Sequence, residues 1–486
     1  MNTIITVSDV LPWTRKNIGL IYVLMIIPTV IFQVFFTPPF QTPDAFNNFY
    51  RSYQVSTGGI IGKKIGNESG GLVNKNMVSM SSLFSYIPFH YNQKINRLVL
   101  SKAKKYRWNN SHHDKQVFTS FPNTSVYPPF AYIPQSIGIL IGRIFNISII
   151  KTYRLSLFLV SLCALFITYI ALQLKSNLNP VIFVIGSLSM TTCLYAAMEA
   201  DALLISVGLL LSSLVASRIY GQRSSPFDLI YVTMMITFLA IQKPPYIALV
   251  FLLFIPSLDL INKYNIIKRL FFSMIPVITT VLWVIYAKIN VWVNIDPSHK
   301  PLISHILFIL ENPVQFVNML LTTISTQGGG YIHQLTGVLG WLDAPLPHSY
   351  VKISLVALSV AFFLSIRAIN IVDWFLISVS ASISFLFVFL ALYADWSPVK
   401  YQVIEGVQGR YFTPFLPFIF MMAYPLFFVI TYFYGKCTTP TLNKLFEYIH
   451  VGFIFESSAY IFIYYFFPII TFLFTVNTII NRYYLM

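Results

Sequence analysis

The sequence predicts an all-α protein that crosses a membrane many times. Of its 486 residues 56% are hydrophobic and only 10% are charged, and the mean hydropathy is +0.70. Apolar stretches recur from Asn17 to Ile480, and the basic residues of the short loops fall on alternate sides of them. A stretch of about 20 apolar residues crosses a bilayer as a helix, because lipid offers no partner for unpaired backbone groups.

About eleven stretches are long enough to be spans, and two long segments separate them into groups. The chain therefore divides into an N-terminal part with the first span (1–36), a first long loop (37–153), spans two to seven (154–290), a second long loop (291–349) and the C-terminal spans (350–486). The predicted spans are 17–36, 154–174, 180–197, 202–219, 227–241, 245–262, 268–290, 350–367, 371–393, 412–434 and 451–480.

The distribution of basic residues predicts the orientation. If the N-terminus is cytoplasmic, every short inner loop carries Lys or Arg, as the positive-inside rule requires, and both long loops lie outside. Within those loops, residues 132–154 and 303–324 are apolar stretches interrupted by polar residues, which favours helices lying along the membrane interface. The inner basic residues are Arg15, Lys16, Lys175, Arg218, Arg223, Lys263, Lys268, Arg269, Arg367, Lys436 and Lys444.

The formal charge of +16 indicates anionic lipid rather than nucleic acid as the counterpart, since polytopic proteins gain basic residues by anchoring their loops. A basic run from Lys94 to Lys115 in the first long loop could attract phosphorylated lipid or lipopolysaccharide, or be a solvated face. The three cysteines lack the spacing of zinc or redox motifs and are interpreted as packing residues. No cofactor or metal site is predicted, and the metal requirement is left open.

Polar turns gather on the predicted outer side. Asp44 follows the prolines that end the first span, and it either caps the next helix or accepts a proton from an attacking hydroxyl. Four further turns lie near residues 198–201, 242–246, 340–347 and 395–410. Carboxylates with cations at one membrane face suit a reaction in which a sugar leaves a lipid phosphate. The charged residues of this set are Asp44, Glu199, Asp201, Asp343, Lys243 and Arg410.

In these blocks the chain resembles the polytopic GT-C glycosyltransferases, in particular a large family of bacterial membrane proteins left as a domain of unknown function. The matching stretches are Pro43-Asp44 with Arg51, then 127–135, 200–202, Lys243, 340–347 and 406–414, in the same order as in the family. Two positions depart from the family pattern, with Ala45 in place of a Glu and Asn48 in place of a His. The base is therefore Asp44 or Asp201.

The resemblance implies a GT-C-like bundle that transfers a sugar from polyprenyl phosphate to O-antigen. The chain also resembles, more narrowly, the phage-carried serotype-converting enzymes, which implies that the sugar is glucose. Transfer would invert the anomeric carbon on the periplasmic side of the bacterial inner membrane. Whether a partner protein flips the donor is left open. Asp44 would be the catalytic base, and Arg410 and Lys243 would hold the donor phosphate. The residues implied in sugar or acceptor binding are Arg51, Asp201, Glu199, Asp343, Trp341, Gln408 and Tyr411.

Two alternatives stay open at this point. A flippase or transporter would move lipid-linked sugar without forming a bond, although Glu456 is the main charge found within a predicted span. A saccharide polymerase or ligase would differ only in using a lipid-pyrophosphate oligosaccharide as donor.

Overall fold

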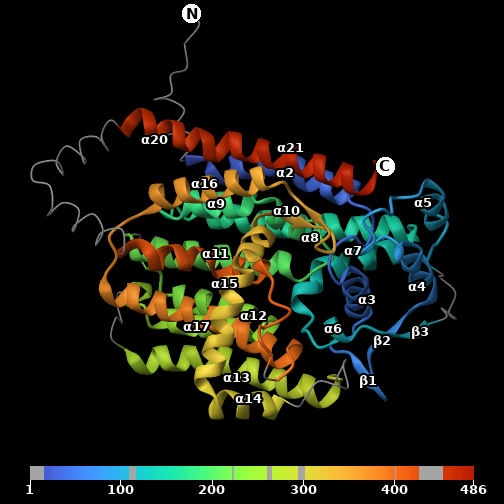
Figure 1. The fold of residues 1–486 in the computed structure, drawn as a ribbon, viewed down its shortest axis with the longest axis horizontal. Coiled ribbons are helices and arrows are strands. Elements are labelled where there is room, and N and C mark those ends of the chain that lie inside the picture. The colour runs from blue at the N-terminus through green and yellow to red at the C-terminus, as the bar shows by residue number, and fades with distance from the viewer. Residues whose placement is uncertain are drawn as a thin grey trace, which may run out of the picture.

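The computed structural model describes residues 16–108, 116–221, 224–259, 265–293, 302–399, 401–425 and 452–485. Most of its long helices run along one common direction, which is horizontal in Figure 1. The helices long and apolar enough to cross a membrane are α2 (Ile18–Phe36), α8 (Ile149–Gln173), α11 (Asp201–Ile219), α13 (Ile266–Asn290), α16 (His348–Ser365), α17 (Ile371–Trp396) and a last span, Ser457–Tyr483, made of parts of α20 (Gly452–Ile461), η6 (Phe462–Phe466) and α21 (Phe467–Tyr483).

The predicted count of eleven spans is wrong: the described residues contain seven candidate spans, or eight if one bent pair counts as a span. Three predicted spans are too short or broken. The predicted span 412–434 lies only partly within the described residues. Several basic loop residues and one cysteine lie outside them. Those residues outside the description are Arg15, Arg223, Lys263, Lys436, Cys437 and Lys444.

The stretch predicted as 180–197 is a broken helix, α9 (Asn179–Ser187) followed by α10 (Ser189–Tyr195). Leu188 adopts an extended backbone between them, with ψ of 141°. The amide freed by the break, that of Ser189, donates to the Tyr350 hydroxyl at 2.9 Å, and the Ser189 hydroxyl bonds Thr475 at 2.7 Å. Lipid offers no hydrogen-bond partners to the backbone, so a helix inside a membrane protein can break only where neighbouring helices provide them. Here the neighbouring helices of the bundle provide these partners.

Two neighbouring predicted spans, 227–241 and 245–262, are also short. Helix α12 (Asp228–Gln242) has 15 residues, which at 1.5 Å per residue reach about 22 Å. Pro244 and Pro245 open the 3₁₀ helix η3 (Pro244–Phe254), whose 11 residues reach about 22 Å at its steeper rise. Both fall short of the roughly 30 Å hydrocarbon core, so these elements cannot each span a bilayer of ordinary thickness.

The second long segment contains a sharp bend at Asn312. Helices α14 (Leu302–Glu311) and α15 (Pro313–Gly337) meet at 105°, and α15 crosses the direction of the other helices in Figure 1. Pro313 begins α15, because a proline fits the first turn of a helix but cannot continue the preceding one. The stretch 303–324, predicted as a helix along the membrane interface, is thus divided between two helices, and its placement at the interface stays a prediction. A two-stranded pair, β4 (Val338–Leu339) and β5 (Ala344–Pro345), leads from α15 to α16.

The first long segment forms a small α/β layer at one end of the bundle (Figure 1). The all-α prediction is wrong here, because three antiparallel strands pair in the order β1-β2-β3. Ile65 pairs with Glu68 across a two-residue Gly66-Asn67 turn in which Gly66 has φ of +59°, a value that favours glycine. The elements are α3 (Ala45–Ser56), β1 (Lys63–Ile65), β2 (Glu68–Asn74), α4 (Lys75–Ser81), η1 (Ser82–Phe84), α5 (Arg97–Ala103), β3 (Gln116–Ser120), α6 (Pro122–Ser125), η2 (Phe130–Tyr132) and α7 (Ile133–Ile144).

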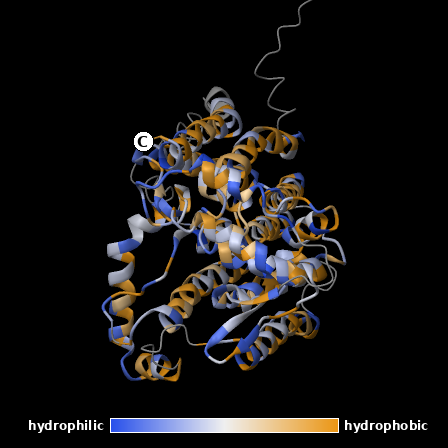
Figure 2. Ribbon diagram, turned by 90° about the vertical axis from the view of Figure 1, so that its right-hand side faces the viewer, coloured by the Kyte–Doolittle hydropathy of each residue, from blue (hydrophilic) through white to orange (hydrophobic). Residues whose placement is uncertain are grey.

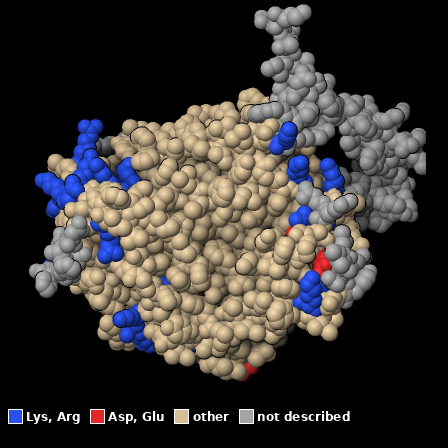
Figure 3. All heavy atoms as spheres, turned by 180° about the vertical axis from the view of Figure 1, so that it is seen from behind, with Lys and Arg blue, Asp and Glu red and all other residues tan. Residues whose placement is uncertain are grey.

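Charge separates the two ends of the molecule. Figure 3 shows Lys and Arg at opposite ends, with a broad middle surface that is almost free of charged side chains. Exposed cations at the α/β end include Lys102 and Lys105 beside α5, whereas Lys175 and Arg367 follow the far ends of α8 and α16. Figure 2 looks onto the α/β end, where the strands and loops contain hydrophilic residues and the helices are largely hydrophobic. An apolar belt between two polar ends is the surface that a bilayer requires.

Candidate functional site at one end of the bundle

Five charged residues from four segments of the chain meet at the end of the bundle that carries the α/β layer. Asp44 precedes α3, Glu199 lies in the turn between α10 and α11, Asp201 begins α11, Lys243 joins α12 to η3, and Arg410 lies in the short 3₁₀ helix η5 (Gly409–Phe415). When successive helices run in opposite directions, every second connecting turn lies at the same end, as do the turns before α11 and after α12. The predicted convergence of these turns at one face is what the structure contains.

Four of these residues form a continuous ionic chain. Arg410 Nη1 donates to Glu199 Oε2 at 2.6 Å and lies 3.8 Å from Asp201 Oδ2. Lys243 Nζ donates to Asp201 Oδ1 at 2.5 Å. The Arg410 and Glu199 side chains are each only 5% exposed, so this pair is shielded from solvent. Charge-assisted hydrogen bonds of this kind are about twice as strong as neutral ones, and they fix the relative positions of the four side chains.

The four side chains of the ionic chain do not satisfy all of their hydrogen-bonding groups. Glu199 Oε1 and Arg410 Nε are buried and have no hydrogen-bond partner. Burial raises the pKa of Glu199 to about 8, although the Arg410 charge opposes this shift. Burial lowers the pKa of Arg410, but Glu199, Asp201 and Asp44 raise it by more, so the guanidinium stays charged. Glu199 Oε1 and Arg410 Nε are thus an acceptor and a donor that the described part of the chain leaves without a partner.

Asp44 differs from the other carboxylates. It occupies the N-cap position of α3, yet its side chain makes no capping hydrogen bond, and its φ of 54° lies in the left-handed region. Asn123 Nδ2 donates to Asp44 Oδ1 at 3.1 Å, and the described residues form no ion pair with this carboxylate. Asp44 is partly exposed and acts electrostatically on both Glu199 and Arg410. Among the described residues Asp44 is therefore the carboxylate of this site that forms no direct ion pair, although the Arg410 charge acts on it at longer range.

Close backbone packing holds η5 in place. A Cβ on Gly409 would lie 1.9 Å from the Tyr331 carbonyl oxygen on α15, and one on Gly208 would lie 2.2 Å from that of Pro414. Only glycine permits such approaches between helices. Tyr246 Oη donates to the Tyr411 carbonyl oxygen at 2.8 Å and ties η5 to η3 as well.

Tyr411 lies beside the ionic chain, while the sugar or acceptor binding predicted for Tyr411 and Gln408 stays a prediction. The Tyr411 ring faces Lys243 Nζ at 4.5 Å from its centroid and the Arg410 guanidinium at 5.5 Å. Such cation–π contacts are worth about 0.5–2 kcal/mol and hold both cations against the ring. Gln408 Oε1 is buried without a hydrogen-bond partner.

Arg51 lies apart from the ionic chain. Its side chain is fully buried in α3, and its guanidinium donates to Gln54 Oε1 and to the carbonyl oxygens of Ile60 and Tyr127. Burial lowers its pKa to about 10. Arg51 therefore stabilises the loops around α3. The direct sugar contact expected for Arg51 would need a guanidinium that faces outward.

Asp343 and Trp341 connect the site to other elements. Asp343 Oδ2 accepts from Arg482 Nη2 at 2.6 Å, and Asp343 Oδ1 accepts from the Trp341 amide at 3.0 Å. Trp341 Nε1 donates to the Phe40 carbonyl oxygen at 2.8 Å, next to the loop that carries Asp44. Asp343 thus fixes the 340–343 turn, while Trp341 borders the Asp44 loop.

The sequence analysis missed several residues here. Asn123 and Arg482 belong to no recognisable motif. The only available signal was the rarity of a polar side chain in the last turn of a span. Within the described residues, no group of three or more His, Cys, Asp or Glu side chains is arranged to hold a metal ion.

The fold and the charged cluster at one end define a multi-pass membrane protein. The profile of the family described as Predicted membrane protein (DUF2142) matches residues 25–419, and the chain belongs to this family. The matched region contains every predicted site residue from Asp44 to Tyr411. No curated protein and no solved structure matches the chain.

Proposed function

We propose that this protein is a glycosyltransferase that moves a sugar, of the glucose type, from a polyprenyl-phosphate carrier to a surface polysaccharide such as O-antigen. The observation that supports it most is the division among the carboxylates. Glu199 and Asp201 are bound by Arg410 and Lys243, whereas Asp44 has only the neutral Asn123 amide as its hydrogen-bond donor. A base beside a cationic site is the arrangement that an inverting transfer from a phosphate needs.

In the proposed reaction, Asp44 takes the proton of the acceptor hydroxyl as that oxygen forms a bond to the anomeric carbon. The bond between the anomeric carbon and the phosphate oxygen breaks, and polyprenyl phosphate leaves with the electron pair. Arg410 Nε, which is buried and has no hydrogen-bond partner, would donate to the departing phosphate. Lys243 lies on the same Tyr411 ring and would add a second positive charge.

The proposed location is the bacterial inner membrane, with the N-terminus in the cytoplasm and the site on the periplasmic side. Support comes from the basic residues that follow the far ends of α8 and α16, opposite the charged cluster. A lipid phosphate as leaving group also suits a compartment without nucleotide sugars.

The test is transfer by the purified protein in liposomes that contain polyprenyl-phosphate-glucose and O-antigen acceptor. We expect Asp44→Asn to lower the turnover roughly a hundredfold to ten-thousandfold, because that is the usual contribution of a general base. Glu68→Gln is the matched control, since Glu68 lies at the same end of the molecule but is exposed on β2. Full transfer by Asp44→Asn would remove Asp44 from the mechanism. Movement of labelled lipid without transfer would favour a flippase.

A further inference from the structure

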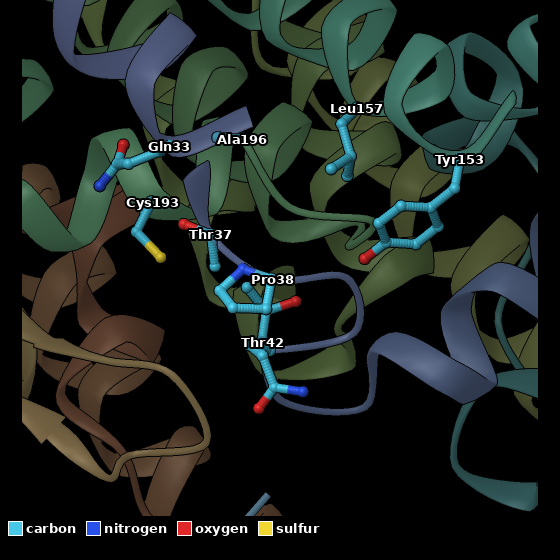
Figure 4. A pocket seen from close by; sticks show the side chains of 9 residues that line it. Gln33, Thr37, Pro38, Thr42, Tyr153, Leu157, Cys193 and Ala196 are labelled. Carbon is cyan, nitrogen blue, oxygen red and sulfur yellow. The ribbon is translucent and has the colours of Figure 1, made fainter. Parts of the chain in front are cut away.

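The ends of three spans meet beneath the α/β layer. Figure 4 shows the loop that leaves α2 lying against α8, where the Tyr153 hydroxyl accepts from the Phe40 amide at 3.2 Å. The cavity enclosed there has a volume of only about 10 Å³, room for one water molecule. The Tyr484 hydroxyl, just beyond α21, donates to the Phe36 carbonyl oxygen at the end of α2 at 2.6 Å. The ends of α2 and α21 and the beginning of α8 therefore form a closed boundary at one level.

The segment 94–107 is fastened to this boundary at both ends. Lys94 Nζ donates to the carbonyl oxygen of Arg482, in the last turn of α21, at 3.1 Å. At the other end, the Ile149 amide in the first turn of α8 donates to the Tyr106 carbonyl oxygen at 3.0 Å. A membrane helix leaves the hydrocarbon region at its ends, so both attachments lie near the level of the lipid headgroups. The segment, which contains α5, therefore follows the membrane surface from α21 to α8.

Five exposed cations lie on this segment, and none of them forms an ion pair with a described carboxylate. Between Glu68 and Glu199 the sequence contains a single acidic residue, Asp114. Figure 3 shows the Lys and Arg side chains at this end as a group with no Asp or Glu visible among them. Their positive charge is thus available to an anionic partner. We name these cations the basic strip; they are Arg97, Lys102, Lys104, Lys105 and Arg107.

Exposed apolar side chains lie beside these cations. Leu98 on α5 is 77% exposed, and Ile144 and Phe145 at the end of α7 are 65% and 72% exposed. Arg107 Nη1 donates to the Asn146 carbonyl oxygen at 2.9 Å, which places the strip next to Phe145. This combination suits a membrane interface, where apolar groups enter the acyl boundary while cations meet phosphates. A soluble acidic polymer would leave the apolar side chains in water.

The basic strip is open along its length. All five side chains are exposed, so each of them can be reached separately from outside the protein. Such an arrangement suits several phosphate groups of a lipid surface, whereas a single phosphate is held by side chains that converge on it.

We infer that the basic strip binds the phosphate groups of anionic phospholipids, such as phosphatidylglycerol, in the leaflet on this side of the membrane. Each Lys or Arg close to an anionic membrane strengthens the association roughly fivefold. Lipids bound here hold the α/β layer, with the loop that carries Asp44, against the membrane surface. This interaction is separate from sugar transfer and does not depend on the reaction that the charged cluster performs.

The test is the lipid selectivity of the full chain in nanodiscs that contain equal amounts of phosphatidylglycerol and phosphatidylcholine. Native mass spectrometry of the released protein counts the retained lipids of each kind. We expect the wild type to retain phosphatidylglycerol preferentially, and Lys104→Gln together with Lys105→Gln to lower this preference roughly five- to twentyfold. Assembly in about 1 M salt should abolish the preference, because the screening length falls to about 3 Å.

Lys63→Gln together with Lys64→Gln is the matched control. These two lysines are also adjacent and exposed, and they lie on β1, at the opposite corner of the α/β layer from α5 in Figure 1. The control removes the same charge from the same end of the molecule and should keep the preference of the wild type. Thermal unfolding of both double variants reports any loss of folding.

Three outcomes would overturn the inference. The wild type could retain both phospholipids equally, or the two double variants could lose the preference equally, which would assign it to overall charge. Retention of added polyprenyl phosphate, but not of phosphatidylglycerol, through Lys104 and Lys105 would assign the strip to the carrier instead. None of these results bears on sugar transfer, so the inference and the proposed function can fail independently.

Discussion

Arg410 donates to Glu199 across 2.6 Å although 211 positions separate the two residues in the chain. The pair links η5 to the turn before α11, and both side chains are almost completely buried. Breaking a buried pair on one side leaves a charge without compensation and costs about 3–5 kcal/mol. The pair therefore contributes to the folded state as well as to the proposed phosphate site.

These two contributions can be separated with a double variant. Above about pH 8, where Glu199 is ionised, we expect Arg410→Ala to lower the free energy of unfolding by about 3–5 kcal/mol, because it leaves a buried carboxylate without its cation. Adding Glu199→Ala should restore part of that loss, whereas sugar transfer should stay absent since the phosphate donor is missing. Thermal unfolding in nanodiscs and the transfer assay measure the two effects. Recovery of transfer together with stability would contradict the role proposed for Arg410.

Stability should depend on pH through Glu199. Burial raises its pKa from 4.5 to about 8, so the folded protein binds this proton more tightly than the unfolded chain does. Stability should therefore fall as the pH rises from about 4.5 to about 8, and this contribution should level off above pH 8. Glu199→Gln cannot titrate and should lose this part of the dependence. Equal pH profiles of thermal unfolding for wild type and variant would argue against the shift.

Gly409 should not tolerate a larger side chain. A Cβ there would approach the Tyr331 carbonyl oxygen to 1.9 Å, so Gly409→Ala should push η5 away from α15 and displace Arg410. We expect a strong loss of transfer and a lower unfolding temperature. Gly328→Ala on α15 is the control: a Cβ at that position has no neighbour within 4 Å, and alanine in a helix favours folding by about 0.5–1 kcal/mol. Similar behaviour of both variants would contradict the packing argument.

The orientation can be tested with single cysteines. Lys102 and Lys175 are exposed, at the α/β end and the opposite end respectively. In a chain without its native cysteines, a membrane-impermeant thiol reagent should label Lys102→Cys in spheroplasts, but label Lys175→Cys only after lysis. The reverse pattern would place the charged cluster in the cytoplasm and overturn the proposed compartment.

Much of the site was predictable because the order of apolar spans in the sequence assigns each connecting turn to one side of the membrane. Asp44, Asp201 and Arg410 each follow or precede an apolar stretch on the same side, so their convergence required only the order of the spans. The roles of individual residues were harder to predict. Arg51 and Arg410 both follow polar motifs, so the sequence does not distinguish them. Tertiary packing does: it buries Arg51 among carbonyl oxygens and Arg410 beside Glu199.

The errors in the fold also have physical causes. Hydropathy measures how apolar a stretch is, but not whether one helix continues through it, and residues 180–197 are apolar on both sides of the break at Leu188. The break depends on hydroxyls of Tyr350 and Thr475, which no local pattern connects to Ser189. In the first long loop, the Gly66-Asn67 turn was a recognisable hairpin signal that the membrane pattern obscured.

The contacts of Arg482 have a consequence for biosynthesis. This residue on α21 bonds Asp343 and the carbonyl oxygens of Ile87 and His90, and the nearby Tyr484 hydroxyl donates to the Phe36 carbonyl oxygen. Segments synthesised early are thus fastened by one made more than three hundred positions later. During translation the turn at Asp343 and the end of α2 therefore lack these contacts until α21 has entered the bilayer. We expect a chain that stops before α21 to insert but to hold its α/β layer less firmly.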